Sequence, residues 1–178
     1  MSEEEKITES EDTEPVVTES DSIHYIRAQF PDLIQEVSNT FGEETIVVSQ
    51  VNLIKFMTFL RDDPSFLYNY LSDLTAIDRL NLDDTIRFAV VYQLYSHKFQ
   101  RRLRVKIPVP EDQLHTESVV SIWPAADWLE REVYDMYGVI FDNHPDLRRI
   151  LMPDDFESYP LRKDYPLHGK GERDNFVF

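Results

Sequence analysis

The chain has 178 residues, of which 42% are hydrophobic and 12% aromatic, no cysteine, and a formal net charge of −16 at pH 7. This composition is typical of a single globular domain, and the lack of cysteine excludes disulfides, iron–sulfur clusters and thiolate zinc sites. The acidic balance disfavours binding to nucleic acid or to an anionic membrane surface, and no apolar run approaches the roughly 20 residues that span a bilayer.

Residues 1–21 form an acidic segment that we interpret as a disordered tail. Its only cation is Lys6, and it buries too little apolar surface to offset the entropy of ordering. A solvated solubility tail is favoured over an interaction arm, because runs of like charge are usually solvated. The segment has neither the basic start nor the apolar stretch of a secretion signal, which indicates the cytoplasm.

Residues 22–143 predict one α+β domain. Apolar periodicity and turn residues predict, in chain order, a helix over 22–29, strands over 33–37 and 45–50 joined in a hairpin at Phe41-Gly42, a helix over 51–61, and strands over 71–82, 86–95 and 101–108. We expect a mixed, mainly antiparallel sheet that is packed by the helices.

The last of these strands alternates apolar and basic residues. A period of two places Arg102, Arg104 and Lys106 together on one face of the sheet. An acidic partner could dock there, but a solvated face with cross-strand carboxylates is favoured, because exposed ion pairs are common and individually weak.

A three-turn helix is predicted from Trp123-Pro124 to Gly138, since proline suits a helix start and glycine a helix end. The spacing gives one stripe of Leu129, Val133 and Tyr137 and an adjoining stripe of Trp128, Glu132 and Asp135. We therefore expect Glu132 and Asp135 to be partly buried. Arg131 lies four residues from both Asp127 and Asp135, which predicts local ion pairs.

Glu132, Asp135 and His144 also raise the hypothesis of an acid–base or metal site in a stand-alone hydrolase. Their spacing fits no strong metal motif, and the chain has no HExxH, G-x-G-x-x-G, P-loop or G-x-S-x-G sequence. We therefore expect no catalytic residue, cofactor or metal in this chain.

Residues 144–178 are predicted to form an extended strap that wraps a partner. Four prolines, Pro145, Pro153, Pro160 and Pro166, prevent a continuous helix or a central strand. The segment is nevertheless rich in apolar and aromatic side chains, which need a surface on which to be buried. The alternative is a tail that folds back over its own domain.

The sequence EREVYDMY from Glu130, followed by His144 and by Arg148-Arg149-Ile150-Leu151, resembles the signature of the C subunit of NADH:quinone oxidoreductase, respiratory complex I. The resemblance continues through HPDLRRILMPDDF and PLRKDYPL, and more loosely through LSDLTAIDRL, so that it covers roughly residues 23–167. Phe156, Ser158 and Tyr159 replace the Trp, Gly and His often seen before PLRKDYP, which blurs only the contacts of the strap.

The resemblance implies a cofactor-free, non-catalytic subunit of the peripheral arm, on the cytoplasmic face of the bacterial inner membrane and attached only through the complex. It implies binding to the D subunit, which holds the quinone site, and also to the B and I subunits. FMN, iron–sulfur clusters and quinone would belong to other subunits, which carry electrons from NADH to quinone and translocate protons. Related subunits of membrane-bound hydrogenase-type complexes, and a free adaptor protein, remain alternatives.

The family pattern, carried over residue by residue, also implies which side chains support the partner interface. These are Glu130, Arg131, Glu132, Asp135, His144, Arg148, Arg149, Arg162, Lys163, Asp164 and Tyr165.

Overall fold

The computed structural model describes residues 20–82 and 86–171, so almost all of the predicted acidic tail lies outside the described residues. The first helix, α1 (Asp21–Gln29), begins one residue before the predicted range. The hydroxyl of Ser20 accepts a hydrogen bond from the amide of Ile23 at 3.3 Å, which caps the helix. The first described residue, Ser20, is therefore the N-cap of α1.

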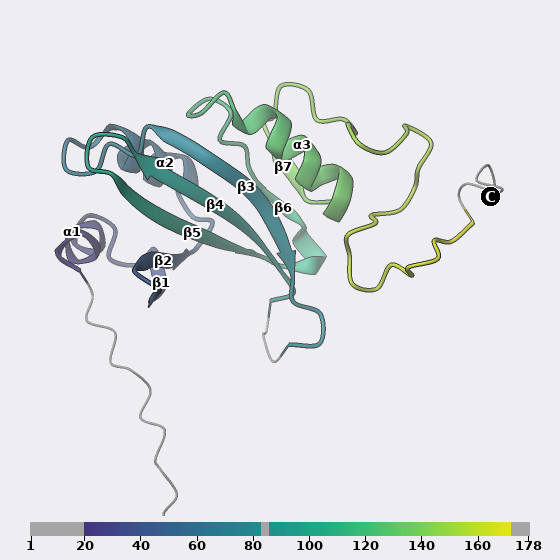
Figure 1. The fold of residues 1–178 in the computed structure, drawn as a ribbon, viewed down its shortest axis with the longest axis horizontal. Coiled ribbons are helices and arrows are strands. Elements are labelled where there is room, and N and C mark those ends of the chain that lie inside the picture. The colour runs from purple at the N-terminus through teal and green to yellow at the C-terminus, as the bar shows by residue number, and fades with distance from the viewer. Residues whose placement is uncertain (1–19, 83–85, 172–178) are drawn as a thin grey trace, which may run out of the picture.

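Five strands form one sheet in the order β1-β2-β5-β4-β3 (Figure 1). Their bounds are β1 (Ile34–Thr40), β2 (Glu43–Val48), β3 (Tyr70–Asp78), β4 (Phe88–Ser96) and β5 (Arg101–Val109). β2 and β5 are parallel, whereas the other three neighbouring pairs are antiparallel. The predicted α+β class with a mixed, mainly antiparallel sheet is confirmed.

The turn between β1 and β2 is the predicted hairpin at Phe41-Gly42. Both residues have left-handed backbones, with φ of 54° at Phe41 and 82° at Gly42. A two-residue turn with two positive φ angles matches the twist of the flanking strands, and glycine adopts such an angle without steric cost.

One hydrophobic core joins the sheet to all three helices, α1, α2 (Leu53–Asp62) and α3 (Ala126–Tyr137). On β5 the residues Leu103, Val105 and Ile107 are almost completely buried, and the residues between them are not. Figure 1 shows α3 beside β3, at one edge of the sheet. Each helix among the described residues is too short or too polar to cross a lipid bilayer.

Two short strands were not predicted from the sequence. β6 (His115–Glu117) follows a single 3₁₀ turn, η1 (Glu111–Gln113), and pairs in parallel with β7 (Ile140–Asp142). Three residues are too few to show a periodic pattern, and a parallel pair depends on partners that are distant in sequence. Because α3 is the connection between these strands, their pairing ties both ends of α3 to the domain.

The strap has no helix or strand within residues 144–171, as its prolines predict. Figure 1 shows it leaving β7 and following an irregular path beside α3. Its side chain Phe156 is 7% exposed, and its backbone bonds to residues of α3. This part of the strap therefore packs on its own domain, while residues 172–178 lie outside the described residues.

Candidate functional site

The carboxylate of Asp135 fastens the strap to α3. Asp135 is completely buried, and its Oδ2 accepts hydrogen bonds from three consecutive strap amides, those of Ile150 (3.0 Å), Leu151 (2.7 Å) and Met152 (2.8 Å). Its Oδ1 accepts a bond of 2.6 Å from Nη1 of Arg149. Burial by itself would raise the pKa of Asp135, but these donors outweigh it and hold the pKa below its ordinary value. Asp135 is therefore an ionised anchor.

Arg149 extends this anchor to the next part of the strap. Its Nη1 also donates to the backbone oxygen of Asp135 at 3.1 Å, and its Nη2 donates to the backbone oxygen of Ser158 at 3.2 Å. The guanidinium lies over the rings of Phe156 and Tyr159, at 5.8 and 5.3 Å from their centroids. The side chain of Arg149 thus connects α3 to the part of the strap that contains Phe156, Ser158 and Tyr159.

The strap also covers the end of α3. Arg162 donates from Nε to the backbone oxygen of Tyr137 at 2.6 Å, and its guanidinium is 4.5 Å from the centroid of the Tyr159 ring. A cation at a helix C-terminus is favoured by the helix dipole. Gly138 ends the helix with φ of 81°, and a Cβ there would lie 2.7 Å from both Arg162 and Tyr159. Glycine is therefore required by backbone angle and by space.

A second anchor holds the strap to the end of the sheet. The side chain of Asp78, at the end of β3, accepts bonds from Nε (3.0 Å) and Nη2 (2.9 Å) of Arg87 and from the amide of Lys163 (2.9 Å). Arg87 also pairs with Asp164 at 2.8 Å. Burial opposes ionisation of Asp78, but Arg87 and the amides lower its pKa to about 2. The strap is therefore pinned at two separate places.

The predicted pairing of Arg131 is wrong. Arg131 donates from Nε to the backbone oxygen of Arg148 at 3.2 Å and from Nη2 to that of Arg149 at 3.5 Å, and it stacks on the ring of Trp128 at 4.9 Å. The described contacts give it no ion pair with Asp127 or Asp135. The carboxylate of Asp135 is taken up by strap donors, so Arg131 instead reaches across to the strap carbonyls.

The structure also corrects the position of Glu132, which was expected to be partly buried and is exposed. Glu130, two residues earlier, is completely buried, and its Oε1 accepts a bond of 2.7 Å from the amide of Val119. Of the predicted stripe only Asp135 is buried, because the strap amides cover it, whereas Glu130 is buried against the segment that follows β6.

His144 begins the strap and is bound to its neighbours. Its Nδ1 accepts a bond from the amide of Asp146 at 3.0 Å, and its Nε2 lies 3.2 Å from the backbone oxygen of Asp127. Asp135 faces the strap amides and Glu132 faces solvent, so the three residues of the hydrolase hypothesis do not converge on one site. Among the described residues, no group of three His, Asp or Glu side chains has the arrangement of a metal site.

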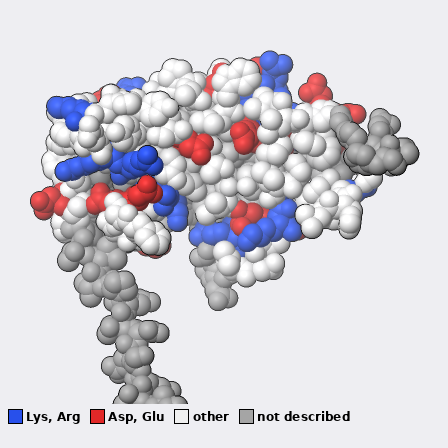
Figure 2. All heavy atoms as spheres, in the orientation of Figure 1, with Lys and Arg blue, Asp and Glu red and all other residues white. Residues whose placement is uncertain are grey.

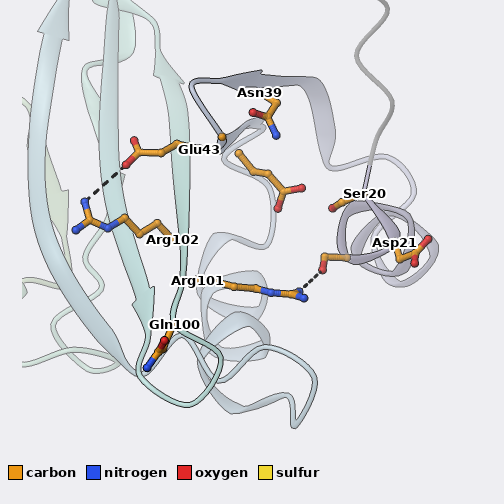
Figure 3. A pocket seen from close by; sticks show the side chains of 10 residues that line it. Ser20, Asp21, Asn39, Glu43, Gln100, Arg101 and Arg102 are labelled. Atoms are coloured by element: carbon orange, nitrogen blue, oxygen red, sulfur yellow. Dashed lines mark hydrogen bonds and ion pairs between the residues drawn. The ribbon is translucent and has the colours of Figure 1, made fainter.

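The basic face of β5 is paired with a carboxylate from β2. Oε2 of Glu43 lies 2.8 Å from Nη2 of Arg104, and its Oε1 lies 3.6 Å from Nη1 of Arg102. Beside this pair is an open hollow of about 540 Å³, in which Arg101 reaches Ser22 of α1 at 3.0 Å (Figure 3). The interpretation as a solvated face with a cross-strand carboxylate is confirmed at Glu43.

The outer side of α3 and the strap leaves large apolar side chains in solvent. Figure 2 shows broad uncharged areas between small groups of charges of both signs. Half of the ten exposed large hydrophobic residues of the described chain belong to α3, β7 or the strap, which together are a minor part of it. They are Trp128, Ile140, Leu151, Leu161 and Leu167.

The eleven residues implied by the family pattern thus divide into two groups. Seven are wholly or partly buried, namely Glu130, Arg131, Asp135, His144, Arg149, Arg162 and Tyr165. Four are exposed, namely Glu132, Arg148, Lys163 and Asp164. The sequence did not reveal Asp78 and Arg87, whose only signal is that each is a charged residue within a predicted strand.

Comparison with known proteins identifies close relatives over most of the chain. The model of the family described as respiratory-chain NADH dehydrogenase, 30 Kd subunit, matches residues 46–171. The C subunit of NADH-quinone oxidoreductase from Geobacter metallireducens is 48% identical over 146 residues, 82% of this chain and 88% of that protein. The protein of the same name from Brucella ovis is 46% identical over 145 residues, 82% of this chain and 70% of that protein.

Two solved structures share the fold. A trypsin-resistant fragment of Nqo5 superposes with a TM-score of 0.62 at 30% identity and covers 71% of this chain and 96% of the fragment. A chain of the archaeal membrane-bound sulfane sulfur reductase superposes with a TM-score of 0.67 at 24% identity, over 82% of this chain and 84% of that one. The second likeness concerns the fold alone.

Proposed function

The chain belongs to the family of the 30 kDa subunit, also called the C subunit, of respiratory NADH:quinone oxidoreductase, and from this we propose that it is a structural subunit of such an assembly. It binds the D subunit, which holds the quinone site, and also contacts the B and I subunits. It carries no cofactor and attaches to the membrane only through the complex, on the cytoplasmic face. FMN, iron–sulfur clusters and quinone belong to other subunits, which perform electron transfer and proton translocation.

The observation that carries the proposal is the arrangement of α3 and the strap. Asp135, Arg149 and Arg131 hold the strap on the helix, while Trp128 and Leu151, from the same two elements, are 64% and 60% exposed. Arg131 links Trp128 to the strap, because its guanidinium stacks on the ring of Trp128 and donates to backbone oxygens of the strap. Exposed aromatic and aliphatic side chains on a rigid support are typical anchors of a protein interface.

The solved fragment of Nqo5 supports a stable folded unit in this family. That fragment resists trypsin and resembles 71% of this chain. A unit that keeps its fold by itself is able to present α3 to a partner without first being ordered by it, which reduces the entropic cost of binding.

Assembly of the complex in membranes tests this function. We expect Trp128→Ala and Leu151→Ser to reduce the yield of assembled complex, because both remove apolar contact with the partner. Val51→Ser is the matched control, since Val51 is 66% exposed but lies between β2 and α2, outside α3 and the strap. The measurement is the amount of complex on native gels together with NADH:quinone reductase activity.

All three purified variants should unfold at nearly the same urea concentration as the original chain, because exposed positions contribute little to stability. A yield that is equal for the two interface variants and for the Val51 control would contradict the proposed face. A purified chain that oxidises NADH or reduces quinone by itself would contradict the structural role.

A further inference from the structure

Glu130 is a buried carboxyl group without a counter-charge. It is 0% exposed, and its Oε1 accepts a bond from the amide of Val119. Its other oxygen, Oε2, is buried and has no hydrogen-bond donor among the described residues. Two cationic side chains that join α3 and the strap bind elsewhere, because Arg149 of the strap pairs with Asp135 and Arg131 of α3 binds backbone carbonyls.

Asp135 provides an internal comparison on the same helix. It is also 0% exposed, but three amides and a guanidinium surround its carboxylate. A buried carboxylate with several donors remains charged, whereas one with few donors and no cation takes up a proton. Asp135 is therefore expected to be ionised at a pH at which Glu130 still holds its proton.

The side chain that faces the free oxygen is the imidazole of His144, whose Nε2 lies 3.9 Å from Oε2 of Glu130. Nδ1 of the ring accepts a hydrogen bond from the amide of Asp146, so this nitrogen carries no proton of its own. The ring is then neutral, and Nε2–H donates to the backbone oxygen of Asp127 at 3.2 Å. His144 in this arrangement supplies no positive charge to Glu130.

Asp127, on the preceding turn of α3, also opposes the ionisation of Glu130, because it adds a like charge. Tyr92 of β4 is completely buried, and burial raises its pKa well above the ordinary value, so its phenol is neutral and supplies no charge to Glu130. Burial is the largest effect and raises the pKa of Glu130 to about 7, although bonds from the hydroxyl of Ser118 and the amide of Val119 lower it. The neutral acid is therefore the stable form below a pH of about 7.

We propose that Glu130 is a proton-binding site of the folded chain, and that loss of its proton releases the start of the strap, at His144 and Asp146, from α3. An ionised Oε2 needs water, and the imidazole of His144, whose side chain is 0% exposed, is the strap group packed against it. Movement of this ring admits water and breaks the bond to the amide of Asp146. The hydrogen bonds that Asp135 accepts from residues 149–152 lie further along the strap and are retained.

The first test is a titration of the side-chain carboxyl carbons of the full chain by ¹³C NMR. We expect the signal of Glu130 to titrate with a midpoint of about 7. Glu132 is the control, because it is exposed on the same helix and should titrate in the range of ordinary glutamates, near about 4. A Glu130 signal that remains ionised down to about pH 5 would overturn the proposal.

The second test is hydrogen exchange of two strap amides, with Met152 on the Asp135 anchor as internal control. Between pH 6 and pH 8, the protection of the Asp146 amide, corrected for intrinsic exchange, should fall about tenfold relative to Met152. In Glu130→Gln, whose side chain is neutral at every pH, the ratio should remain constant. A ratio that is constant in the original chain refutes the link to the strap, and so does an equal fall in the variant.

Discussion

Glu130 and Asp135 lie on the same helix and are both completely buried, yet Asp135 is paired with Arg149 whereas Glu130 accepts from a neutral backbone amide. α3 therefore presents two carboxyl groups of different character to the strap. Asp135 is a permanent charge that fixes the strap near Arg149. Glu130 lies in an environment that penalises charge, so it holds its proton to a higher pH than Asp135 does.

Removal of the charge at Asp135 should destabilise the domain. In Asp135→Asn, Arg149 stays largely buried without its counter-charge, and an uncompensated buried charge costs about 3 to 5 kcal/mol. We expect a loss of about 3 kcal/mol in the free energy of unfolding, measured by urea denaturation. Glu132→Gln on the exposed side of α3 is the control and should change stability by less than about 0.5 kcal/mol. Equal effects would mean that the Asp135 anchor does not stabilise the chain.

Gly138 should be sensitive to a methyl group for two separable reasons. Gly138→Ala places a Cβ 2.7 Å from Arg162 and Tyr159 and also strains a backbone with φ of 81°. Gly42→Ala is the matched control, since its φ is 82° and a Cβ there meets no atom within 4 Å. Both variants should lose about 1 kcal/mol from backbone strain, and Gly138→Ala should lose a further 1 to 3 kcal/mol, roughly, from overpacking. Similar urea midpoints for the two variants would show that Arg162 and Tyr159 move away from the added methyl group without a loss of stability.

The anchor at Asp78 should make the free energy of unfolding decrease at acidic pH. Its pKa is about 2 in the folded chain against 3.8 for the free group, so its contribution is present above pH 4 and is lost as the pH falls through 2. This shift corresponds to about 2 kcal/mol. Asp78→Asn should therefore show a smaller loss of stability between pH 4 and pH 2 than the original chain, in urea unfolding at each pH. Parallel curves for the two proteins would contradict the ionised anchor.

Truncation after Leu151 should separate folding from association. The shortened chain keeps Arg149 and the amides of Ile150 and Leu151 as donors to Asp135 but loses the strap residues that follow. We expect a folded domain, by circular dichroism, that no longer associates stably with the D subunit, because the shortened strap buries less surface on the partner. A truncated chain that assembles normally would show that these later residues do not contact the partner.

Deletion of residues 2–19 should leave NADH:quinone reductase activity of the complex intact, because this acidic segment is too polar to form a packed interface. The deletion retains Ser20, whose hydroxyl caps α1. Ser20→Ala in the full chain is the comparison, and it should lower the stability of the domain by about 1 kcal/mol. Failure of the complex to assemble after the deletion would identify the segment as a binding arm.

The elements of the domain were predictable because their causes are local. Alternation on β5 identifies the buried residues Leu103, Val105 and Ile107, since successive side chains of a strand point to opposite faces. Phe41-Gly42 specifies a tight hairpin, and Gly138 ends α3. The signature from Glu130 to Leu151 was sufficient to indicate the family.

The partners of the charged side chains were decided by the path of the chain. Spacing along one helix suggested that Asp135 pairs with Arg131, but its cation is Arg149, beyond the end of the helix. The parallel pair of β6 and β7 and the bond between Asp78 and the amide of Lys163 likewise join residues far apart in sequence. Periodicity identifies which face of an element is covered, but the segment that covers it is set by the balance of packing and charge in the whole fold. The sequence by itself therefore determined the three helices, the five strands of the main sheet and the family, and the tertiary structure determined the short β6–β7 pair and which carboxyl groups are paired.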